Sequence, residues 1–173
     1  MKEIFINQDK ETRCYIMAAI FFFQGYSEVD DYSVWRGDQN LDMLGLSKRD
    51  MEIFPIPNYN KLVTNLRNIS DKEIQSFIVG RTYREVLVSG RKDALQHFQV
   101  FCIDLKWNIR DIEESMQVTE ELYEIKPVFN PYPLSSTNSN IQKPNSNNPY
   151  NNNGCLRFFI IFAVTFILGL LIF

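Results

Sequence analysis

Residues 21–51 read FFFQGYSEVDDYSVWRGDQNLDMLGLSKRDM, and this stretch decides the fold class. An apolar run ends at Gly25, an acidic segment follows, and apolar residues at helical spacing then continue to Gly45. Ser47 precedes Asp50 at the spacing of a residue that caps a helix. The pattern predicts a helix, a turn, a second helix, another turn and a short third helix, because strand-like alternation does not persist.

The same order of features recurs in residues 86–116, which read VLVSGRKDALQHFQVFCIDLKWNIRDIEESM. An apolar helix end again meets a glycine, Gly90, and a polar helix of similar length follows. Each stretch closes on a short segment with an Arg-Asp pair, at 49–50 and at 110–111. Two diverged copies of one helical unit would explain this similarity. Chance likeness between two amphipathic helical stretches is the alternative.

Capping signals extend the helical pattern over residues 1–126. Asp9 is predicted to cap a helix that runs to about Gln24, and Ser27 to cap the next one. Further start signals are Asn58, a capping box over Ser70–Glu73, and Asn108. We therefore expect an all-α domain, a compact bundle of about six to seven short helices.

The C-terminal residues have a different composition. Residues 127–154 are rich in Asn, Ser and Pro, so they predict a disordered tether that cannot bury enough apolar surface to fold. Residues 158–173 read FFIIFAVTFILGLLIF and carry no charge. Within 155–173 this predicts a transmembrane tail anchor that enters a lipid bilayer. The N-terminal domain is then expected in the cytoplasm, and no signal peptide is apparent at the N-terminus.

Charge and cysteine usage exclude several classes of function. The net charge is −3, which gives no electrostatic support for nucleic-acid binding. Cys14, Cys102 and Cys155 form no close pair, so neither a disulfide framework nor a zinc site is indicated. His97 is the only histidine, and a packing role is favoured over catalysis. The sequence shows no nucleophile with an identifiable base, and we expect no enzyme activity.

The repeated pattern resembles the TerB-like tellurite-resistance family of small helical domains. The residues that carry the resemblance are Gln24-Gly25 with Glu28, Asp30 and Asp31, then Leu44-Gly45-Leu46-Ser47, and in the second half Ser89-Gly90 with Asp93. The resemblance covers roughly residues 10–120. It implies an acidic metal-binding surface and a link to stress response and membrane-associated complexes. The family's acid before each glycine is replaced here by Gln24 and Ser89.

Four acids are the candidate metal ligands: Glu28, Asp30, Asp31 and Asp93. Carboxylates suit Ca²⁺ or Mg²⁺. Acids in the first turn of a helix are also favoured by the helix dipole alone, so capping is the competing interpretation. We expect a membrane-tethered, non-enzymatic module that binds or scaffolds an unidentified membrane-associated protein. The alternative is a domain that binds or senses a divalent metal ion.

Overall fold

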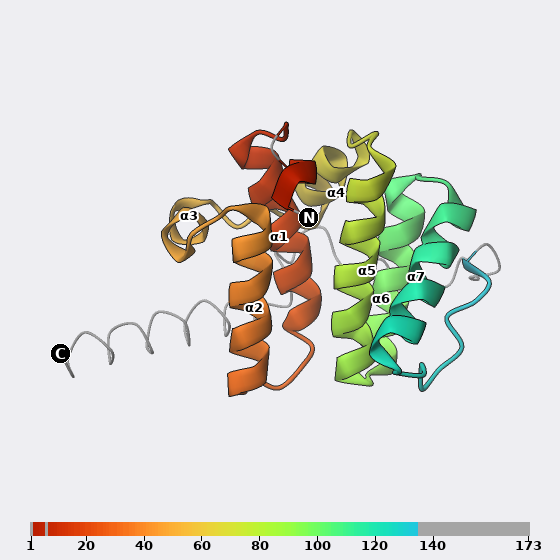
Figure 1. Cartoon of the computed structure of the whole chain (residues 1–173). Helices are drawn as coiled ribbons and strands as arrows, with labels where there is room; N and C mark the ends of the chain where they lie inside the picture. Colours follow the sequence, from red (N-terminus) through yellow and green to blue (C-terminus); the bar gives the residue numbers. More distant parts are fainter. Residues whose placement is uncertain (1, 6, 135–173) are drawn as a thin grey trace.

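A computed structural model describes residues 2–5 and 7–134, and all regular structure within them is helical (Figure 1). This confirms the predicted all-α class. A short 3₁₀ helix, Lys2–Phe5, comes first. Seven α-helices follow: α1 Lys10–Gln24, α2 Asp31–Leu44, α3 Lys48–Ile53, α4 Tyr59–Arg67, α5 Lys72–Ser89, α6 Lys92–Leu105 and α7 Ile109–Tyr123.

Most helices begin where capping chemistry predicts. The confirmed N-caps, whose side chains accept a backbone N–H of the first turn, are Asp9, Ser47, Asn58 and Asn108. Two predicted caps are wrong by a few residues. Asp30, not Ser27, caps α2, because Asp30 and Ser33 satisfy each other's backbone N–H groups. Asp71, not Ser70, caps α5, because its carboxylate accepts from the N–H groups of Glu73 and Ile74.

The core is built around α1 and α5. Every residue of α1 from Cys14 to Gln24 is buried, which agrees with the apolar run in the sequence. Phe23 of α1 packs edge-on against Phe98 and Phe101 of α6, with ring centroids 5.6 and 5.3 Å apart. Tyr83 of α5 stacks on Phe98 at 5.1 Å. These rings join three helices into one core, and α7 packs on the outer side of α5 (Figure 1).

The folded domain extends past the predicted boundary at residue 126. Leu134 is buried, and its backbone N–H donates to Glu113 Oε1 at 3.1 Å. Tyr132 donates from its hydroxyl to Glu120 Oε1 at 3.1 Å, and Gln99 donates to the carbonyl of Pro131. Residues 127–134 are therefore part of the helical domain rather than of a tether. The rest of the predicted tether and the predicted anchor, 135–173, lie outside the described residues.

No helix in the described ranges has the length and apolar character needed to cross a bilayer. The two similar sequence stretches do give the same order of elements, α1–α2–α3 and α5–α6–α7. Their details differ, because Gly25 has a right-handed backbone (φ −63°) and Gly90 a left-handed one (φ 59°). The closing helix has 6 residues in α3 and 15 in α7. Common origin of the two halves stays a prediction.

Candidate functional site

The acids of the first predicted metal cluster lie at the start of α2. Glu28 is exposed in the turn before the helix, and Asp31 is exposed in its first residue. Asp30 accepts the Ser33 N–H at 2.6 Å, and this hydrogen bond lowers the pKa of the Asp30 carboxyl. Asp30 therefore has a full structural role as a helix cap.

Asp93, the fourth candidate, lies in the first turn of α6 and is paired with Arg91. The guanidinium donates to both Asp93 oxygens, at 2.9 and 2.6 Å, which lowers the pKa of Asp93. A carboxylate engaged on both oxygens by a guanidinium has little capacity left for a cation. Residues 2–5 and 7–134 contain no group of three or more His, Cys, Asp or Glu side chains that could hold a metal ion. The described residues therefore add no support to the metal-binding alternative, which stays a prediction.

The two turns are nevertheless neighbours at one end of the bundle. Tyr26, from the turn before α2, hydrogen-bonds through its hydroxyl to His97 Nδ1 on α6. The Arg91 guanidinium lies 5.6 Å from the centre of the Tyr26 ring. Burial lowers the pKa of His97, so its imidazole is neutral near pH 7. His97 thus joins the two halves by packing and hydrogen bonding. The thiols of Cys14 and Cys102 are buried in the core.

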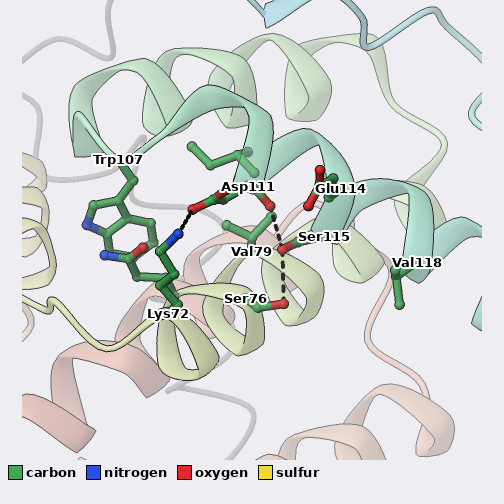
Figure 2. Close-up of a pocket in the computed structure, with 10 residues that line it drawn as sticks. Lys72, Ser76, Val79, Trp107, Asp111, Glu114, Ser115 and Val118 are labelled. Carbon is green, nitrogen blue, oxygen red and sulfur yellow. Dashed lines mark hydrogen bonds and ion pairs between the residues drawn. The ribbon is translucent and has the colours of Figure 1, made fainter.

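A groove lies between α5 and α7. Its volume is about 360 Å³. Figure 2 shows Trp107 at one end, Val118 at the other, and Lys72 reaching from α5 toward Asp111 of α7. The residues that line it are Lys72, Gln75, Ser76 and Val79 of α5, Trp107 of the loop before α7, and Asp111, Ile112, Glu114, Ser115 and Val118 of α7.

The polar side chains in this groove form ion pairs and hydrogen bonds with one another. Lys72 Nζ lies 2.8 Å from Asp111 Oδ2, and this contact raises the pKa of the lysine. Lys72 therefore stays protonated and cannot take a proton from a neighbouring serine. The Ser115 hydroxyl donates to the Asp111 carbonyl oxygen at 2.8 Å and lies 2.9 Å from Ser76 Oγ. The groove thus offers donors, acceptors and apolar surface to a ligand.

Trp107 has one polar atom that the fold leaves unused. The side chain is buried, and its indole Nε1–H has no hydrogen-bond partner among the described residues. An unsatisfied buried donor costs roughly 1–3 kcal/mol.

The groove itself is absent from the sequence predictions. Its walls come from α5 and α7, which are separated by a whole helix along the chain, so no local motif marks it. The one available signal is the pair Val118 and Leu122, apolar residues one turn apart on a helix whose apolar residues Ile112 and Met116 are buried. Comparison with protein-family models, with curated proteins and with solved structures found no match to this chain.

Proposed function

We propose that this chain is a non-enzymatic helical module that binds a membrane-associated protein through the α5–α7 groove. The observation that carries the proposal is the apolar surface continuous with the groove. Val118, at its edge, is 61% exposed, and Leu122, one turn further along α7, is 70% exposed. Exposed apolar side chains next to a hollow with a polar rim are typical of interaction surfaces.

The groove indicates how a partner would be held. An apolar side chain of the partner would pack on Val79, Ile112 and Val118. Tryptophan in a desolvated pocket is a common source of binding energy, and charged rim residues such as Lys72 and Glu114 contribute more to specificity.

The predicted anchor would place the partner in the same membrane. Residues 158–173 are uncharged and apolar, and we propose that they hold the domain at a bilayer on its cytoplasmic side. Tethering raises the effective concentration of the groove toward other membrane proteins, so a modest intrinsic affinity suffices. A role in a stress response follows only from the resemblance to TerB-like domains.

Site-specific photo-cross-linking tests the proposal. A benzoylphenylalanine at position 118 or 122 of the full-length chain, expressed in its native cells, should give one discrete adduct after irradiation. The matched control is position 88, where Val88 is exposed on α5 outside the groove. Lys72→Glu should weaken the adduct at 118 without unfolding the domain. No adduct at 118 and 122, or equal adducts at 88, would contradict the proposal.

A further inference from the structure

The outer side of α2 carries a second surface that the groove does not use. Tyr32 is 57% exposed and Trp35 is 51% exposed. Their rings stack on each other, with centroids 5.5 Å apart and an interplanar angle of 19°. Helix α2 lies at the opposite side of the bundle from α7 in Figure 1. We refer to Tyr32, Trp35 and the acids Glu28, Asp30 and Asp31 as the α2 face.

A buried arginine contacts the aromatic pair and holds it in place. The Arg36 guanidinium lies 4.7 Å from the centre of the Tyr32 ring. Arg36 is itself buried and fixed by Glu85, with Nη2 and Oε2 3.0 Å apart. Tyr32 therefore rests on an immobilised cation, and Trp35 stacks against Tyr32. A surface that is ordered before its partner arrives loses less entropy on binding.

The rim of the α2 face is negative. Glu28, Asp30 and Asp31 are all exposed, and they precede the aromatic pair directly in the chain. The two arginines that contact tyrosines in this region are already paired with acids, Arg36 with Glu85 and Arg91 with Asp93. Half-exposed aromatic rings beside exposed carboxylates are complementary to a guanidinium, which stacks on an indole and pairs with carboxylates.

We propose that the α2 face binds an arginine-bearing, cationic segment of a partner protein. One guanidinium would stack on Trp35, and neighbouring positive charges would pair with Asp31 and Glu28. The same charges disfavour the other occupants of an aromatic surface. Anionic lipid headgroups would be repelled by the carboxylates. A second copy of this chain in a two-fold arrangement would place the acidic rims against each other.

Binding of fluorescein-labelled nona-arginine to the full-length chain tests this proposal. Fluorescence anisotropy is followed in an uncharged detergent at about 50 mM NaCl, where surface charges are weakly screened. Trp35→Ala should weaken binding about five-fold, the loss expected for one exposed cation–π contact. Trp35→Phe keeps an aromatic ring and should stay within about two-fold of the wild type. Thermal melts of each variant check that the domain is folded.

The charge contribution needs a matched control. The double variant Glu28→Gln/Asp31→Asn should weaken binding by about five-fold, like the loss of Trp35. Glu121→Gln/Glu124→Gln removes the same charge from exposed positions on the α7 side and should change affinity by less than about two-fold. Equal weakening by both doubles, with no effect of Trp35→Ala, would show attraction to net charge only and would overturn the proposal.

Two further experiments test the other possible occupants of the α2 face, an anionic lipid surface and a second copy of this chain. A preference of the wild type for phosphatidylserine vesicles over phosphatidylcholine vesicles that Trp35→Ala abolishes, without nona-arginine binding, would identify a lipid surface and overturn the proposal. Dimers in analytical ultracentrifugation that dissociate in Trp35→Ala, again without nona-arginine binding, would identify a second copy and overturn it. The proposal does not depend on the α5–α7 groove. If cross-linking from positions 118 and 122 gave no adduct, the expected result for the α2 face would be unchanged.

Discussion

Helices α2 and α6 hold the same place in the order of elements of the two similar stretches, have 14 residues each, and are held by different forces. The buried residues of α6 are all apolar: Ala94, Leu95, Phe98, Val100, Phe101, Cys102 and Leu105. Those of α2 are mostly polar or small: Ser33, Arg36, Gly37 and Asn40, with Leu41 and Leu44. Helices of equal length in similar places can thus depend on apolar burial or on a buried charge network.

The network under α2 is centred on Glu85 of α5. Its carboxylate oxygens form ion pairs with two arginines, Oε2 with Arg36 Nη2 at 3.0 Å and Oε1 with Arg84 Nη2 at 2.6 Å. All three side chains are buried. Asn40 of α2 is also fully buried, and its side-chain amide has no hydrogen-bond partner among the described residues. Buried ion pairs add little net stability but are costly to break. We infer that α2 is the more weakly held helix and that Glu85 controls its attachment.

Removing the charge of Glu85 is expected to have the largest effect. Glu85→Gln leaves Arg36 and Arg84 buried without a counter-charge, and it should cost about 3 to 5 kcal/mol of unfolding free energy. Urea denaturation of the full-length chain in detergent measures this loss. Glu121→Gln, at an exposed position on α7, serves as the control and should have an effect of less than about 0.5 kcal/mol. Equal small effects of both variants would show that the network does not hold α2.

The turns before the two helices should respond differently to alanine. Gly90 has φ 59°, so Gly90→Ala forces a left-handed alanine and should cost about 1 to 2 kcal/mol, even though space for a Cβ is open there. Gly25 has φ −63°, which any residue adopts, so Gly25→Ala carries no such strain. Chemical denaturation compares them. A Gly25 variant as unstable as the Gly90 variant would contradict the described turn geometry.

Removal of the N-cap of α2 is expected to have a smaller effect on stability. Asp30→Ala removes the acceptor of the Ser33 N–H and should lower the midpoint of thermal unfolding by about 3 °C. Ser27→Ala, at the cap position that the sequence alone suggested, should leave the midpoint unchanged. Circular dichroism melts distinguish the two. The reverse order of the two effects would restore Ser27 as the cap.

The contact between the halves predicts a small pH dependence. Burial lowers the pKa of His97 below its ordinary value of 6.5, so the unfolded chain takes up this proton first as the pH falls. The contribution of neutral His97 is present above pH 6.5 and is lost as the pH falls through the pKa of the folded state. Urea unfolding at several pH values, for wild type and His97→Gln, measures it. If the unfolding free energy of the wild type rose relative to that of His97→Gln as the pH fell below 6.5, the prediction would be wrong.

Local chemistry explains which parts of the fold the sequence could predict. Caps such as Asp9 and Ser47, and helix ends at Gly45 and Gly90, depend on residues within one turn, so their patterns are visible along the chain. The wrong caps occur where several cap residues are clustered, and the Ser33 hydroxyl selects Asp30 there. The all-helical class follows from the same local periodicity.

Long-range contacts explain what could not be predicted. Arg36 and Glu85 are far apart in sequence, and each is an ordinary charged residue until the helices pack. The groove likewise needs α5 and α7 side by side before Lys72 can reach Asp111. The metal prediction rested on acids near two glycines. The contacts that the structure gives two of these acids are local rather than long-range, since Asp30 accepts from Ser33 and Asp93 pairs with Arg91.

Native-state hydrogen exchange of the full-length chain is the most direct test of the difference between α2 and α6. The amides of Trp35–Leu44 in α2 should exchange through openings of lower free energy than the amides of Phe98–Leu105 in α6. Glu85→Gln should lower the protection of α2 further and change α6 only by the loss of global stability. If the amides of α2 and α6 opened with equal free energies in the wild type, and both helices lost protection together in Glu85→Gln, the inference that α2 is the more weakly held helix would be wrong.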